Sequence, residues 1–167
     1  YAEFYRQETS IPCLCADYLE GDDLIAGYVL RFPEDDHVIY STDKDFMQLI
    51  GSIPGEVTLV ESQHDTERNL DEYNGDPELF MFEKCFRGEG ETGDNVQNAY
   101  PRLLRKKIHE AYTDAYILSN LMNHEFNVSC MDPNGDPMVH TYRTGDLLIE
   151  NRILMSLTEQ PDPVKEL

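Results

Sequence analysis

Basic side chains are scarce in this sequence. The 167 residues include 13 Lys and Arg against 33 Asp and Glu, which gives a formal net charge of −20. Because phosphate contacts need Lys and Arg, this charge by itself argues against non-specific nucleic-acid binding. Two interpretations survive that objection: bound metal ions neutralise some acids, or a part of the protein outside this chain carries the basic surface. We interpret the scattered acids as a solvated, solubilising face.

Long apolar runs are absent too. No stretch approaches the ~20 apolar residues that a membrane-spanning helix needs, and no basic-then-apolar leader is visible. The hydrophobic fraction of 40% is still typical of a folded globular chain with a real core. Because the chain begins at Tyr1 rather than Met, we expect it to be a fragment of a longer protein.

Cysteines are few, and their spacing excludes a common metal motif. They stand at positions 13, 15, 85 and 130. Cys13-x-Cys15 lacks the two-residue gap of a zinc knuckle, and no second pair lies nearby. We therefore interpret all four as reduced, mostly buried thiols of a cytosolic protein.

The apolar pattern alternates between strand and helix. It predicts strands at 13–15, 37–41, 57–60 and 138–142, and helices at 20–31, 44–50, 77–86, 101–112, 115–124 and 146–157. In chain order, residues 13–60 therefore alternate as strand, helix, strand, helix, strand. This order is typical of a parallel α/β sheet with helices on its faces.

Acidic residues gather in three clusters, at 20–23, 43–45 and 91–95. In an open parallel sheet, sites form beyond the carboxyl ends of the strands, where the first two clusters are expected. Carboxylates in such numbers suit hard divalent cations. The competing interpretation is that these acids only cap helices and pair with helix dipoles, a common role for a residue such as Asp43.

The residues around the clusters resemble the 5′ nuclease family, whose members have a PIN-like fold. Ser41 to Leu49 matches its S-x-D-x-D-x-x-Q-L pattern. Tyr18 to Ala26 resembles its E-A-D-D-x-I-A helix start, with Gly in place of Ala. Gly90 to Val96 resembles its G-D-x-S-D-N-I loop, with Glu for the first Asp and Gly for Ser. The segment 77–85 looks closest to the phage ribonuclease H type branch.

The resemblance implies a domain organisation. Residues 1–96 would be the C-terminal part of the PIN-like catalytic domain, with a mostly parallel sheet. Residues 97–167 would be a helical, helix–hairpin–helix-like region that contacts DNA. The family's N-terminal strand with its metal-binding Asp, and its helical arch, are not in this chain, so we expect them upstream of Tyr1.

The resemblance also implies a site with two Mg²⁺ or Mn²⁺ ions. The first ion or its water shell would take Glu20, Asp22, Asp23 and Asp43, and the second would take Asp45, Glu91 and Asp94. Asp22, Asp43 and Asp45 would be the catalytic carboxylates. Glu91 in place of Asp lengthens one ligand by a methylene, which suggests a contact through water.

A basic cluster follows the third motif, in an otherwise acidic chain. It consists of Arg102, Arg105, Lys106 and Lys107. At the start of a helix, such a cluster is suited to phosphate contact, although an ordinary solvated basic face would look the same. The family's glycine-rich hairpin is replaced by Ala99-Tyr100-Pro101-Arg102, so we do not expect a backbone-carbonyl potassium site.

The function implied is that of a two-metal 5′-to-3′ exonuclease or flap endonuclease with ribonuclease H activity in phage-type DNA replication. We expect a cytoplasmic monomer, in the host cell if phage-encoded, without membrane contact. Its partners would be DNA or RNA–DNA hybrid with a 5′ end or flap, and replication proteins such as a single-strand binding protein or sliding clamp. Two alternatives stay open: a catalytically silent nucleic-acid-binding or interaction fragment, and an acidic cation-binding module without a nucleic-acid role.

Overall fold

The structure is a computed structural model that describes residues 7–17, 19–88, 96–131 and 134–158. The chain divides into two compact units, one made of Tyr1–Glu72 with Leu157–Leu167 and the other of Tyr73–Ser156. The domain boundary predicted at residue 96 falls inside the second unit. Among the described helices, none is long and apolar enough to cross a membrane.

The first unit is built around a small mixed sheet. Its elements are α2 (Gly21–Arg31), β1 (His37–Tyr40), η1 (Asp45–Leu49), β2 (Val57–Glu61) and β3 (Thr66–Arg68). The strand order is β1-β2-β3, with β1 and β2 parallel and β3 antiparallel to β2. The predicted parallel pairing therefore exists between β1 and β2. The antiparallel β3 was not predicted, because it is three residues long and polar.

Alternation along β1 divides the sheet into a buried and an exposed face. Ile39 is buried and lies opposite Leu59 of β2, and Ala26 and Val29 of α2 are buried in the same unit. Val38, by contrast, is 73% exposed. The strand predicted at 37–41 is thus only half buried. Within the described residues, no strand pairs with the second edge of β1.

The strand predicted at Cys13–Cys15 is absent, and this expectation is wrong. The structure assigns no strand to these residues, and Leu14 is 59% exposed. Three alternating residues are too short a pattern to specify a strand that lacks a pairing partner. Among the three cysteines whose side chains the structure describes, Cys15 is exposed, Cys13 is partly exposed and Cys85 is buried, and burial raises the pKa of the Cys85 thiol to about 11.

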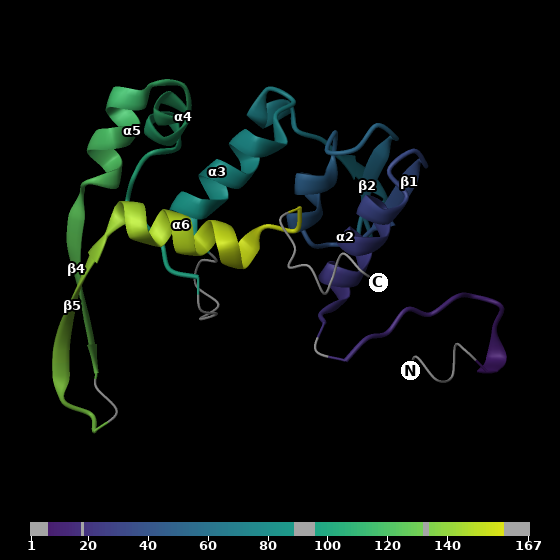
Figure 1. The fold of residues 1–167 in the computed structure, drawn as a ribbon, viewed down its shortest axis with the longest axis horizontal. Helices are drawn as coiled ribbons and strands as arrows, with labels where there is room; N and C mark the ends of the chain where they lie inside the picture. Colours follow the sequence, from purple (N-terminus) through teal and green to yellow (C-terminus); the bar gives the residue numbers. More distant parts are fainter. Residues whose placement is uncertain (1–6, 18, 89–95, 132–133, 159–167) are drawn as a thin grey trace. The chain divides into compact units, whose positions relative to one another are not determined.

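The second unit combines helices with a β-hairpin (Figure 1). Its elements are α3 (Pro77–Arg87), α4 (Arg105–Thr113), α5 (Ala115–Met122), β4 (Glu125–Met131), β5 (Pro137–Arg143) and α6 (Thr144–Met155). The antiparallel strands β4 and β5 extend from the ends of α5 and α6, with Phe126 opposite Tyr142. The region predicted to be helical therefore contains a hairpin whose first strand the sequence pattern did not reveal.

One apolar cluster holds the second unit together. It consists of Met81, Cys85, Phe86, Ala99, Ile108, Leu147, Leu148 and Met155. Within the same unit, the side chain of Asn151 is 1% exposed, and its Nδ2 donates to the carbonyls of Cys85 (2.8 Å) and Gln97 (2.7 Å). Burying this amide is tolerated because both of its N–H groups are bonded. Asn151 thereby ties α6 to the end of α3 and to the chain at Gln97.

The two ends of the segment that carries the third acidic motif lie close together. Gly88 ends α3 at φ 63°, and a Cβ there would come within 2.4 Å of the Val96 carbonyl oxygen. Ala99 N also donates to Phe86 O at 2.9 Å. Gly88 is therefore required both for its positive φ and for the close backbone approach. Glu91 and Asp94 themselves lie outside the described residues.

Candidate metal and nucleic-acid site

The first acidic cluster forms the start of α2. Glu20 is the N-cap residue, and its backbone N–H donates to Asp23 Oδ2 at 3.1 Å. Asp22 and Asp23 lie in the first turn, where the helix dipole favours negative charge. All three acids keep some solvent exposure. These acids therefore do cap the helix, as the competing interpretation expected. Their carboxylate groups can still accept further bonds, because each carboxylate has several lone pairs.

The second cluster forms a tight turn between β1 and η1. Ser41 N donates to Val60 O at 3.0 Å, which extends the parallel pairing by one residue. Ser41 Oγ then accepts from Asp43 N at 3.0 Å, and Asp43 Oδ1 accepts from Asp45 N at 2.8 Å. Serine and aspartate side chains favour such turns because they bond backbone N–H groups two residues on. As predicted, Asp43 and Asp45 directly follow the carboxyl end of a parallel strand.

The last two residues of this motif have structural roles. Gln48 is 4% exposed, and its Oε1 accepts from Leu157 N at 3.0 Å. Leu49 is fully buried in the same unit. The glutamine side chain thus fixes a backbone group 109 residues away in the sequence, which explains why a polar residue occupies this buried position.

The described acids do not converge on a single point. Among residues 7–17, 19–88, 96–131 and 134–158, no three His, Cys, Asp or Glu side chains are placed to hold one metal ion. Five of the seven predicted ligands lie in the first unit: Glu20, Asp22, Asp23, Asp43 and Asp45. Glu91 and Asp94 fall outside the described residues. That all seven gather in one site is still a prediction.

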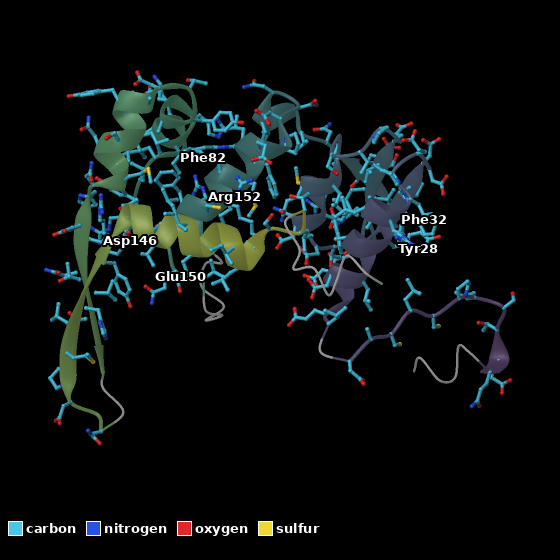
Figure 2. All side chains as sticks on the ribbon, in the orientation of Figure 1. Tyr28, Phe32, Phe82, Asp146, Glu150 and Arg152 are labelled. Atoms are coloured by element: carbon cyan, nitrogen blue, oxygen red, sulfur yellow. The ribbon has the colours of Figure 1, made fainter. Side chains whose placement is uncertain are left out.

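An apolar groove lies along α2, beside the first cluster. Leu14, Asp23, Tyr28 and Phe32 are among the residues that line it. Figure 2 labels Tyr28 and Phe32, whose ring centroids are 4.9 Å apart. Both aromatic side chains are more than 40% exposed. This groove could not be predicted from the sequence, because Tyr28 fits the helical apolar pattern that normally indicates a buried side chain.

The predicted basic cluster is divided by the structure. Arg102 lies before α4 at φ 66° and is exposed, as are Lys106 and Lys107. Lys107 Nζ lies 2.8 Å from Glu110 Oε2, and this ion pair lowers the pKa of Glu110. Arg105, the first residue of α4, instead donates from Nε to Glu83 Oε2 at 2.8 Å and stacks on the ring of Tyr73. Part of the cluster therefore stabilises the unit itself.

Glu83 is a buried carboxylate at the centre of this arrangement. Only 5% of the residue is exposed. Burial would raise its pKa, but hydrogen bonds with His109, Arg105 and Arg87 outweigh burial and lower it. The sequence did not identify Glu83 as a buried ion-pairing residue, because in the sequence it is simply one acid within an apolar helix. A spacing of four residues to Arg87 is visible in the sequence, but the partners on α4 are 22 and 26 residues away.

Among the comparisons with known proteins, the one with solved structures finds a similar protein. No family model matches the sequence, and no curated protein matches it. Among solved structures, the crystal structure of the T5 D15 protein co-crystallised with metal ions is similar, with a TM-score of 0.63 and 18% sequence identity. The two proteins share a fold.

The likeness to T5 D15 covers 94% of this chain and 56% of the T5 D15 chain. This chain therefore spans little more than half the length of that protein. The shared architecture is mixed α/β with small sheets. At 18% sequence identity, the likeness is one of fold.

Proposed function

We propose that the protein is a metal-dependent 5′-to-3′ exonuclease or flap endonuclease. It would hydrolyse phosphodiester bonds in DNA or RNA–DNA primers with a 5′ end or flap, leaving a 3′-hydroxyl and a 5′-phosphate. The observation that carries the proposal is the motif from Ser41 to Leu49. It forms a fixed acidic turn at the carboxyl end of a parallel strand, in a fold shared with a protein crystallised with metal ions.

The acidic side chains are chemically suited to hard divalent cations, because such cations prefer oxygen ligands and these side chains offer carboxylate oxygens. We propose that Mg²⁺ or Mn²⁺ ions are held by Glu20, Asp22, Asp23, Asp43, Asp45, Glu91 and Asp94. When bound, such ions lower the pKa of a water molecule and stabilise the attacking and leaving oxygens of an in-line displacement. The chain's own contribution is positional: Ser41 and the N-terminus of η1 fix the backbone that presents Asp43 and Asp45.

The nucleic acid would be held through its phosphates by the exposed cations near α4. Arg102, Lys106 and Lys107 present positive charge in a chain of net charge −20. A local basic surface is what backbone contact requires, whatever the overall charge. We extend the proposal to a role in phage-type DNA replication, in the cytoplasm, with replication proteins as partners.

The competing proposal is a catalytically silent nucleic-acid-binding or interaction fragment. The observation in its favour is that the chain spans only 56% of the T5 D15 protein. It differs from the enzyme in one measurable respect: nucleic-acid binding would persist without any cleavage.

Cleavage of a 5′-flap substrate with Mg²⁺, by the intact protein and three variants, tests the enzyme. We expect Asp43→Ala and Asp94→Ala each to lower the rate by about a hundredfold or more, because a lost ligand weakens the metal and its electrostatic effect. Glu150→Ala, on the exposed face of α6 (Figure 2), is the control and should cleave normally. Unchanged rates in both aspartate variants would overturn the enzyme assignment. An intact protein that binds but never cleaves would favour the silent fragment.

A further inference from the structure

Five aromatic rings form a continuous row in the second unit. Tyr100, which precedes α4, stacks on His124 with the ring centroids 4.2 Å apart and an interplanar angle of 17°. The His124 ring lies 6.2 Å from Phe126 at 17°, and the Phe126 ring lies 6.0 Å from Tyr142 at 32°. His140 ends the row, 6.0 Å from Tyr142 at 38°. The row therefore runs from the chain before α4 out along β4 and β5.

Shallow interplanar angles distinguish this row from aromatic contacts among the helices of the same unit. Phe82 meets Phe86 at 70° and Tyr112 at 56°. Such tilted and edge-on contacts are common between packed aromatic side chains, because the edge of a ring is positive and its face negative. Rings in nearly parallel planes present their faces in a common direction. This is the arrangement that suits a series of stacked bases.

The face of the hairpin that carries the row has no acidic side chain among its described residues. Phe126 is paired with Tyr142 and Val128 with His140, and directly opposite residues of an antiparallel pair share one face. Glu125 alternates to the opposite face. In a chain with 33 acids and 13 basic residues, this face adds no charge repulsion of its own against a polyanion.

The row is fixed at its inner end and open at its outer end. Tyr100, Phe126 and Tyr142 are half-buried and pack against the apolar cluster of the second unit. His140 is exposed, on the part of the hairpin that extends away from the helices of this unit (Figure 1). Rings that a core already holds in place lose little freedom when a ligand stacks on them. Arg102, two residues after Tyr100, adds an exposed cation for the backbone of such a ligand.

We propose that this aromatic row is a stacking surface for the unpaired bases of single-stranded nucleic acid. The proposal rests on the proposed function and specifies it further: the row holds the single-stranded part of the substrate, in addition to the phosphate contacts near α4. Stacking uses the faces of the rings, so His124 and His140 need no charge to take part. Every base has a flat face, and we therefore expect little preference for sequence.

The test compares two probes that differ only in their bases. One is a fluorescently labelled oligo-dT strand, and the other is a labelled strand of equal length made of abasic sugar–phosphate units. Fluorescence anisotropy without divalent cations gives the affinity of the full chain for each probe over a range of KCl concentrations. We expect oligo-dT to bind at least about fivefold more tightly, because only this probe can stack on the rings. Equal affinities for the two probes would overturn the proposal.

Substitutions in the row should affect only the probe that has bases. We expect His140→Ala and Tyr142→Leu each to weaken oligo-dT binding about fivefold to tenfold, the size of one lost stacking contact. The slope of log affinity against log salt should stay the same, because no phosphate contact is lost. His140→Phe keeps a ring and should bind as the unaltered chain does. Unchanged oligo-dT binding in both His140→Ala and Tyr142→Leu, or equal losses for both probes, would overturn the stacking role.

The matched control is Tyr116→Leu. Tyr116 lies on α5 in the same unit, is 77% exposed and stands outside the row. We expect this variant to bind oligo-dT normally, and a loss as large as that of Tyr142→Leu would show that any exposed ring serves and would overturn the site. A thermal unfolding scan checks that Tyr142→Leu is folded. Should it not fold, His140→Ala, at an exposed position, still decides the role of the row.

A third probe, a duplex with a 5′ flap, separates this inference from the proposed function. If the unaltered chain binds this duplex while the row variants bind oligo-dT normally, the stacking surface is overturned and the proposed function stands. If the unaltered chain binds neither the flap duplex nor oligo-dT at low salt, the nucleic-acid contact of the proposed function is overturned as well.

Discussion

At the scale of single residues, the structure separates charges that look alike in the sequence. Lys107 and Arg105 stand two positions apart, yet Lys107 pairs with an exposed acid while Arg105 bonds a buried carboxylate and an aromatic ring. An exposed ion pair contributes little to stability, whereas a buried carboxylate deprived of its partners is costly. Arg105 therefore has a structural role beside any role in binding.

The lowered pKa of Glu83 predicts how stability depends on pH. A depressed carboxyl pKa stabilises the folded state above the ordinary Glu value of about 4.3, and this contribution is lost as pH falls through the folded-state pKa. We expect Glu83→Gln to lower the unfolding free energy by about 1–3 kcal/mol at pH 7. The difference from the unaltered chain should shrink on acidification.

Urea unfolding at a series of pH values, followed by circular dichroism, measures this difference. Glu150→Gln is the control, since its exposed side chain should leave the curve almost unchanged. A Glu83→Gln effect that is the same at low and neutral pH would contradict an ionised, bonded Glu83.

At the scale of elements, helix caps explain where α3 and α5 begin. Asp76 Oδ1 accepts from Glu78 N (2.9 Å) and Leu79 N (3.3 Å), and Asp114 Oδ1 accepts in the same way from the first turn of α5. Asp76 differs in that its second oxygen, Oδ2, accepts from the Tyr112 hydroxyl at 2.9 Å. Asp76 thereby joins α3 to α4 as well as capping α3.

The two caps predict unequal costs of substitution. Asp114→Ala should lower the unfolding free energy by about 1 kcal/mol, which is typical of a lost N-cap. Asp76→Ala should cost about 2 kcal/mol, because it also leaves the part-buried Tyr112 hydroxyl without this acceptor. Urea midpoints of the two variants give the comparison, and equal losses would show that the bond to Tyr112 is of no consequence.

At the scale of the whole molecule, the net charge of −20 dominates the electrostatics. Self-repulsion destabilises a compact acidic chain, and salt screens it over about 10 Å at 0.1 M. We expect the melting temperature to rise as NaCl is added, in a calorimetric scan at neutral pH. A falling melting temperature would show that attractive ion pairs outweigh the repulsion.

Divalent metal ions should stabilise the folded chain by binding to it, in addition to screening the repulsion between its acidic groups. If Mg²⁺ binds the folded chain at the proposed carboxylates, it adds about 2.7 kcal/mol at a hundred times its dissociation constant. We expect a melting temperature with Mg²⁺ above that with NaCl of equal ionic strength, and loss of the excess in Asp43→Ala. Identical melting curves in the two salts would count against an assembled metal site in this chain.

Several parts of the fold and site follow from local sequence patterns. Helix α2 and the parallel pair β1 and β2 appear where apolar periodicity predicted them, because each pattern spans enough residues to favour one structure. The acidic turn after β1 was also predictable, since Asp43 and Asp45 are placed by bonds to residues two positions away. Strands β3 and β4 were not, because their stability depends on partners rather than on their own pattern.

The sequence by itself determined the acidic character of the protein, most of its helices and the local form of its acidic motif. Only the tertiary structure decided which charged and polar groups are buried together. Glu83 meets Arg105 and His109 across more than 20 residues, and Gln48 meets the backbone of Leu157 across 109. A buried polar group is stable only with partners in position, and those partners are set by how the helices pack rather than by neighbours in the chain.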